Sequence, residues 1–194
     1  MTYRAEDIVR FRKLGSRGLV VFERDGILLK TKRLSKDLAV NDLNRPLIVM
    51  LRHFRTQGIR FGFLSNDRGM DANSGGRVAA LALMDLIDTI LRVDNAEPDF
   101  WMAMPFSKPT CSPNAREARD DARSSFMLLR AIEWYGIERE QVILVTNSSA
   151  RTIAASPAGV TTVKFSALSP RADGTADLLE IQRMDSAVKV SLGL

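Results

Sequence analysis

Short apolar runs rich in β-branched or aromatic residues alternate along this chain with segments of helical periodicity, and this alternation is the strongest constraint on its fold. The apolar runs lie at residues 18–22, 59–64, 100–104, 141–145 and 161–165. Helical segments are expected at residues 43–57, 77–92, 115–135 and 150–156, with two more at 7–14 and 175–184. A continuous apolar run is typical of a strand that is buried on both faces of a parallel sheet. The pattern therefore predicts an α/β fold, a Rossmann-like three-layer sandwich whose central parallel sheet is joined by right-handed crossovers.

Length and composition are those of a single globular domain, which we expect to cover residues 1–194. The chain is 45% hydrophobic and 26% charged, which is ordinary for such a domain. No apolar run approaches the ~18 residues of a membrane-spanning helix, and the N-terminus lacks the layout of a secretion signal. Cys111 is the only cysteine, so neither a disulfide framework nor a cysteine-based zinc site is expected. Together these features favour a cytoplasmic location.

The charge of the chain is positive, with 28 Lys and Arg residues against 23 Asp and Glu residues. Such an excess attracts nucleic acid or other polyanions. The densest basic stretches, at residues 10–17 and 30–36, lack the interleaved aromatic residues of a surface that binds single strands. A solvated basic surface is the simpler explanation of the charge, with a nucleic-acid partner as the alternative, and the sequence leaves the oligomeric state open.

Four groups of polar residues stand at strand ends or before a predicted helix. In chain order they are Glu23–Gly26 (ERDG), Ser65–Asp67 (SND), Ser107–Pro109 (SKP) and Thr146–Arg151 (TNSSAR). In an open parallel sheet, ligands bind outside the carboxyl ends of the strands, where the strand order reverses. These groups are therefore the candidates for a functional site.

The four groups, in this order, resemble the motifs of the haloacid dehalogenase (HAD) superfamily of phosphatases. The Arg in FERDG, the SND group and the Lys-Pro pair are most similar to its histidinol-phosphatase and heptose-bisphosphate-phosphatase branch. The run at 154–160 (ASPAGV at its end) is similar to the family's helix-to-strand turn. The resemblance covers roughly residues 18–165 and implies a HAD-like domain. The gaps of 39 residues between Asp25 and Ser65 and 42 between Ser65 and Lys108 leave no room for a large cap domain.

Several positions match the family's functional residues. By resemblance, Asp25 takes the place of the general acid and base. Ser65, with Asn66 beside it, takes that of the phosphate donor. Lys108 corresponds to the lysine that neutralises charge on the phosphate in the transition state.

Other positions depart from the family. The nucleophile position, an Asp in the family, holds Glu23, whose extra methylene displaces the carboxylate, and a ~1 Å misplacement can cost ~10²-fold in rate. The expected Gly-Asp after the fourth strand reads Thr146-Asn147, and the later acidic position holds Arg151. The residues left to bind Mg²⁺ are Glu23, Asp25 and Asn147, although Mg²⁺ usually needs carboxylates. The phosphate half of the site is therefore kept while the metal half loses negative charge.

Two hypotheses follow. In the first, the chain is a catalytically impaired phosphatase-fold protein that binds a phosphorylated small molecule or a partner, with Ser65, Asn66, Lys108 and Arg151 holding the phosphate. In the second, it is an active Mg²⁺-dependent phosphomonoester hydrolase, acting on a small metabolite or a nucleic-acid end. Glu23 would then be nucleophile or metal ligand, with Asp25 and Lys108 as further catalytic residues. Neither hypothesis includes a structural zinc, because Cys111 alone cannot form one.

Overall fold

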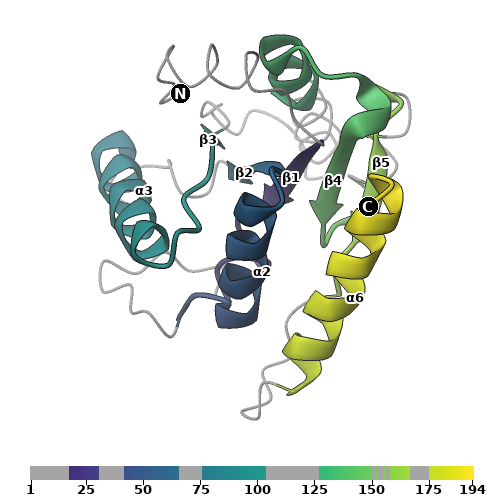
Figure 1. Cartoon of the computed structure of the whole chain (residues 1–194). Helices are drawn as coiled ribbons and strands as arrows, with labels where there is room; N and C mark the ends of the chain where they lie inside the picture. Colours follow the sequence, from purple (N-terminus) through teal and green to yellow (C-terminus); the bar gives the residue numbers. More distant parts are fainter. Residues whose placement is uncertain are drawn as a thin grey trace.

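The structure, a computed structural model, describes residues 18–30, 42–65, 76–103, 127–149, 158–166 and 175–194, together with Thr152 and Ala155. Within these residues, a sheet of five parallel strands runs in the order β3-β2-β1-β4-β5 (Figure 1). The strands are β1 (Leu19–Glu23), β2 (Arg60–Ser65), β3 (Phe100–Ala103), β4 (Val142–Thr146) and β5 (Thr161–Lys164). The α/β class and the parallel sheet predicted from the alternation are thus confirmed.

The helices named in Figure 1 are α2 (Arg45–Thr56), α3 (Gly76–Val93) and α6 (Thr175–Ser191). Residues 127–135 are also helical, and a 3₁₀ turn, η4 (Arg139–Gln141), leads into β4. The start of α2 follows from its sequence, because the Asn44 side chain accepts a hydrogen bond from the Leu47 N–H at 3.3 Å and Pro46 lies in the first turn.

Helices cover both faces of the sheet, which makes three layers. Successive strand residues point to opposite faces, and the apolar side chains form two clusters accordingly. Val20 and Phe22 of β1 pack in a cluster with α2, α3 and α6. Leu19 and Val21 pack in the other cluster with residues 127–135. β1 and β4 are therefore buried along their whole length, as their apolar runs indicate, whereas the edge strand β5 is exposed or half-buried.

The last helix is longer than the sequence predicts. The predicted helix ends at Met184, whereas α6 continues to Ser191. Ile181, Met184 and Val188 are buried at helical spacing, and α6 packs on α2 and β5. The β-branched residues of the final turns weaken the local helix preference, and tertiary packing overrides it.

β1, β2 and β4 each begin and end one residue later than predicted, so that Glu23, Ser65 and Thr146 are the final residues of these strands and do not follow them, while β5 ends one residue earlier than predicted. Phe100 and Trp101 are buried and Trp134 is half-buried, as expected of core aromatics, and His53 is exposed on α2. The helix at 7–14, the first part of 115–135, most of 150–156, and the segments where a cap would be inserted lie outside the described residues. Among the helices described, none is both long and apolar enough to cross a membrane.

Candidate functional site

The candidate site lies where β1 and β4 end side by side. β1 pairs with β2 on one side and with β4 on the other, with Glu23 opposite Leu64 and Phe22 opposite Val145. Because the chain leaves β1 toward β2 and later returns to β4 on the opposite side, the strand order reverses between β1 and β4. This is the point at which open parallel sheets bind ligands.

Glu23 is buried, with 4% of its surface exposed, and its carboxylate is hydrogen bonded to the end of β4. Its Oε2 accepts the Thr146 hydroxyl at 2.7 Å and the Asn147 backbone N–H at 2.9 Å. The Thr146 hydroxyl in turn accepts the Ser148 N–H at 2.9 Å. Hydrogen bonds to a carboxylate are stronger than those between neutral groups. The Glu23 side chain therefore fastens the carboxyl ends of β1 and β4 together.

Arg24 and Asp25 form an ion pair within the turn that follows β1. The Arg24 Nε lies 2.9 Å from Asp25 Oδ1 and its Nη2 lies 3.2 Å from Oδ2, so both carboxylate oxygens accept from one guanidinium. The side chain of Arg24 is 2% exposed and that of Asp25 16%. The backbone carbonyl of Arg24 accepts the N–H groups of Leu28 and Leu29, which closes the turn. A buried guanidinium needs such a partner, since an unpaired buried charge is strongly destabilising.

Asn147 packs against the same turn. Its Nδ2 donates to the Asp25 backbone carbonyl at 3.2 Å. Gly26, with a φ of +82°, lies so close that a Cβ built on it would be 2.3 Å from Asn147 Nδ2. Glycine is thus required at position 26 both for the backbone conformation and for the approach of the amide.

The structure brings together Glu23, Asp25 and Asn147, as the sequence predicts. The backbone of Ser65 lies at the end of β2, next to β1, and its side chain is outside what the structure describes, as are Asn66, Lys108 and Arg151. Two contacts were not predicted: the Thr146 hydroxyl on Glu23, and the pairing of Arg24 with Asp25. The sequence does hold a sign of the first, because a polar Thr ends an otherwise apolar strand.

The arrangement presents hydrogen-bond donors to the two acidic residues. Glu23 faces a hydroxyl and a backbone N–H, Asp25 faces a guanidinium, and Asn147 turns its amide nitrogen toward the nearby carbonyl. Within the described part of the chain, no three His, Cys, Asp or Glu side chains are grouped so that they could hold a metal ion.

The sheet order and the helices on both faces are those of a Rossmann-type α/β fold, and comparison with solved structures shows that this fold is shared with HAD-like phosphatases. A crystal structure of a candidate HAD-like phosphatase from Mesorhizobium loti matches with a TM-score of 0.67 at 18% identity, over 90% of this chain and 87% of that one. The D,D-heptose 1,7-bisphosphate phosphatase from B. bronchiseptica, solved with magnesium and phosphate, matches with a TM-score of 0.59 at 16% identity, over 75% and 78%.

A third crystal structure, of an uncharacterized protein from Corynebacterium glutamicum, matches with a TM-score of 0.53 at 18% identity, over 93% of this chain and 97% of that one. No family model and no curated protein matches the sequence. The similarity is therefore one of fold, and it includes the heptose-bisphosphate phosphatase that the motifs resemble.

Proposed function

We propose that this protein uses the HAD-like fold to bind a phosphorylated small molecule at the carboxyl edge of the sheet without hydrolysing it. The observation that carries the proposal is the position of the Glu23 carboxylate, whose Oε2 accepts hydrogen bonds from both Thr146 and Asn147. A nucleophile at this place would have to approach phosphorus in line. The contacts instead direct Glu23 sideways, toward β4.

The two acids that remain are poorly suited to catalysis. Hydrogen-bond donors on the Glu23 carboxylate withdraw electron density from its oxygens, which makes them weaker nucleophiles toward phosphorus. The extra methylene of Glu23 also displaces the carboxylate by ~1 Å, which can lower the rate ~10²-fold. Both oxygens of Asp25 accept from the Arg24 guanidinium, so a substrate group would have to compete with the guanidinium for the same carboxylate. These contacts favour binding over catalysis.

The residues described at this edge also do not fit Mg²⁺. A hard cation takes oxygen ligands, mostly carboxylates and carbonyls. The Asp25 carbonyl accepts the Asn147 amide nitrogen, and a donor nitrogen in that place repels a cation. The amide thus takes the place at the carbonyl that a metal ion would need.

Binding is supported by the phosphate half of the site. By resemblance, Ser65, Asn66, Lys108 and Arg151 are the proposed phosphate ligands, and both lysine and arginine suit the task. A structure with a similar fold was solved with phosphate. The proposed ligand is therefore a phosphomonoester of a small metabolite.

Calorimetric titration with inorganic phosphate, together with a p-nitrophenyl phosphate assay, tests the proposal. We expect phosphate to bind equally well in EDTA and in excess Mg²⁺, and p-nitrophenyl phosphate not to be hydrolysed above background. Lys108→Gln should weaken phosphate binding roughly tenfold or more, because it removes a charge-assisted contact. The double change Glu23→Asp with Asn147→Asp should make phosphate binding depend on Mg²⁺.

Two outcomes would overturn the proposal. Mg²⁺-dependent hydrolysis by the natural sequence that is lost in Glu23→Gln and Asp25→Asn would establish the active hydrolase instead. Absence of phosphate binding, with or without Mg²⁺, would exclude the ligand-binding function.

A further inference from the structure

The apolar seam between α2 and α6 opens into a groove where both helices begin. Along α6, Ile181, Met184 and Val188 are buried, whereas Leu178, one turn before Ile181, is 45% exposed. Leu178 continues the stripe by which α6 packs, but nothing described covers it fully. Across from it on α2, Val49 is 53% exposed. α2 and α6 are in contact, and both helices begin at the same end of the molecule (Figure 1). The exposure of Leu178 and Val49 leaves the apolar contact incomplete at that end.

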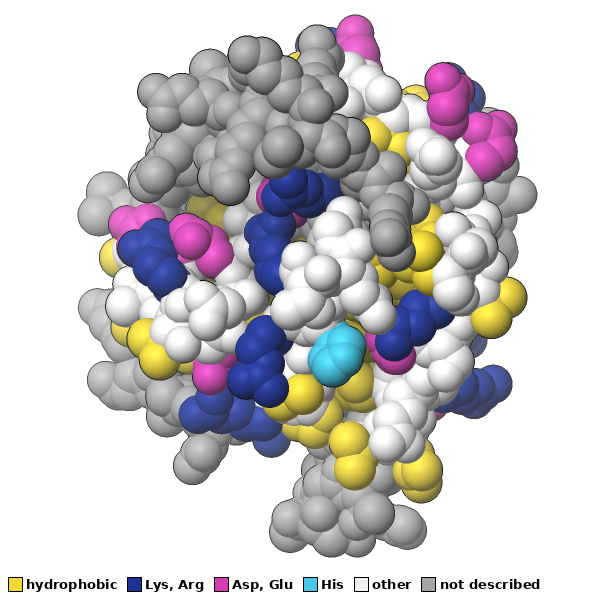
Figure 2. All heavy atoms as spheres, viewed as in Figure 1, with side chains coloured by type: hydrophobic (Ala, Val, Ile, Leu, Met, Phe, Trp, Pro, Cys, Tyr) yellow, Lys and Arg dark blue, Asp and Glu magenta, His cyan; other side chains and the backbone are white. Residues whose placement is uncertain are grey.

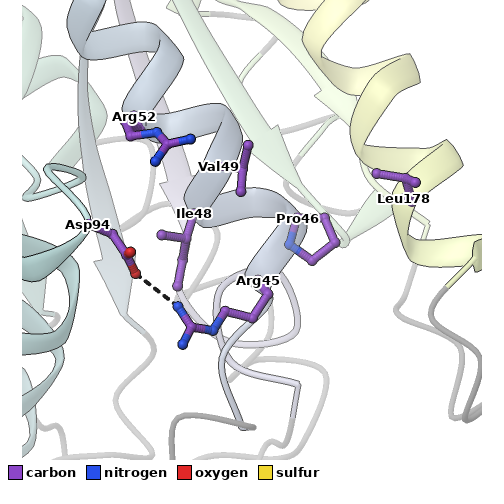
Figure 3. Close-up of a pocket in the computed structure, with 7 residues that line it drawn as sticks. All are labelled: Arg45, Pro46, Ile48, Val49, Arg52, Asp94 and Leu178. Atoms are coloured by element: carbon purple, nitrogen blue, oxygen red, sulfur yellow. Dashed lines mark hydrogen bonds and ion pairs between the residues drawn. The ribbon is translucent and has the colours of Figure 1, made fainter.

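This opening is a pocket with a volume of about 350 Å³. Its walls are mainly apolar, formed by Pro46, Ile48 and Val49 of α2 and by Leu178 of α6. Figure 3 shows Leu178 pointing from α6 toward Pro46. The remaining lining residues are charged: Arg45 and Arg52 of α2, and Asp94 just after α3. We refer to these seven residues as the groove.

The charged rim of the groove is net positive. Arg45 Nη1 lies 2.9 Å from Asp94 Oδ2, with both side chains partly exposed, which neutralises one arginine. Arg52 forms no ion pair with any residue that the structure describes. The N-terminus of α2 adds positive potential, and its first turn contains no acidic residue to offset it. On the face in Figure 2, Lys and Arg side chains lie beside the hydrophobic patch near the start of α2.

We propose that the groove binds a small organic anion with an apolar body, of the kind represented by a medium-chain carboxylate. The apolar walls would cover the body, and Arg52 at the rim would bind the anionic group. The volume falls in the range of ~300–1,000 Å³ for small-molecule pockets. A stable protein partner would need ~800 Å² on each side, far more than these few side chains offer. None of the seven residues belongs to the carboxyl-edge site, so this ligand is additional to the phosphorylated one.

The experiment titrates the full chain with 8-anilinonaphthalene-1-sulfonate, an apolar anion whose fluorescence rises on binding, and then displaces it with decanoate. Arg52→Gln should weaken both ligands roughly tenfold, the usual effect of losing a hydrogen bond to a charged group. Val49→Asp should abolish binding, because it places a carboxylate among the apolar walls. Matched controls are Arg183→Gln and Val190→Asp, at positions on α6 that are exposed and outside the groove, and these should bind as the natural sequence does.

Circular dichroism checks that each variant is folded, and both substituted groove positions are exposed, so their folds should be kept. Equal dye binding by the groove variants and their controls would overturn the proposal, as would failure of decanoate to displace the dye. Sedimentation of the protein alone and with lipid vesicles supplies a further test, and either of two results would overturn the proposal. If the natural sequence is a dimer and Val49→Asp dissociates it, a second copy of the chain occupies the groove. If the protein binds decanoate only when decanoate is part of a vesicle, the groove contacts a membrane.

Discussion

Gly26 has a positive φ of 82° and lies against the side-chain amide of Asn147. Replacing it with alanine should destabilise the protein in two ways. A left-handed conformation costs a non-glycine residue roughly 1–2 kcal/mol, and forcing an atom into an occupied space costs about 1–3 kcal/mol. We expect Gly26→Ala to lower the free energy of unfolding by about 2–5 kcal/mol in urea denaturation.

Gly58 provides a matched control for this prediction. Its φ of +72° is similar, but a Cβ there would meet nothing within 4 Å. Gly58→Ala should therefore show the conformational cost alone. The excess cost at position 26 should shrink when Asn147 is also changed to serine, because the shorter side chain removes the clash. Equal losses for the two glycine variants would mean that Asn147 does not pack against the turn.

At the scale of elements, the strands and most helices follow from the sequence, because an apolar run or a 3.6-residue period reports burial directly. The extent of α6 does not, since its last turns depend on packing against α2 and β5. The convergence of Glu23, Asp25 and Asn147 was predictable from the shared carboxyl edge. The direction of each side chain was not: the pairing of Arg24 with Asp25 depends on rotamers that only the folded turn selects.

The contact between α3 and β3 gives a prediction about pH. Trp101 Nε1 of β3 donates to Asp88 Oδ1 of α3 at 2.6 Å. Burial raises the pKa of Asp88 above 3.8, with Glu97 and Asp85 also raising it, while the Trp101 hydrogen bond and Arg92 lower it. The folded state then holds the proton to a higher pH than the unfolded state, so this group's contribution to stability falls as pH rises from about 3.8 through the folded pKa.

Asp88→Asn should remove this loss while its side-chain oxygen still accepts from Trp101. Relative to the natural sequence, we expect the variant to gain stability as pH rises from acidic to neutral in a series of urea unfolding curves. Asp85→Asn, an exposed change on the same helix, should show a much smaller dependence. A stability difference that is constant across this pH range would contradict the raised pKa.

At the scale of the whole molecule, the sheet is shared by two hydrophobic clusters. α2, α3 and α6 pack on one face, and residues 127–135 pack on the other. The central strands β1, β2 and β4 contribute side chains to both clusters. A substitution that destabilises one cluster should therefore also destabilise the other, because the two share these strands. The groove arises at this scale too, because it exists only where α2 and α6 separate.

We therefore expect the two clusters to unfold together in one cooperative transition. Ile181→Ala removes a side chain of α6 that is 3% exposed and should lower the free energy of unfolding by about 2–5 kcal/mol. Leu179→Ala, where the side chain is 64% exposed, should change it by less than about 0.5 kcal/mol. Trp101 reports on the cluster that contains Ile181, and Trp134 on the opposite one. The measurement uses two variants, each of which keeps only one of the two tryptophans. Ile181→Ala should shift the unfolding transition reported by Trp101 and the one reported by Trp134 equally. If the transition reported by Trp134 did not shift, the two clusters would unfold as separate units.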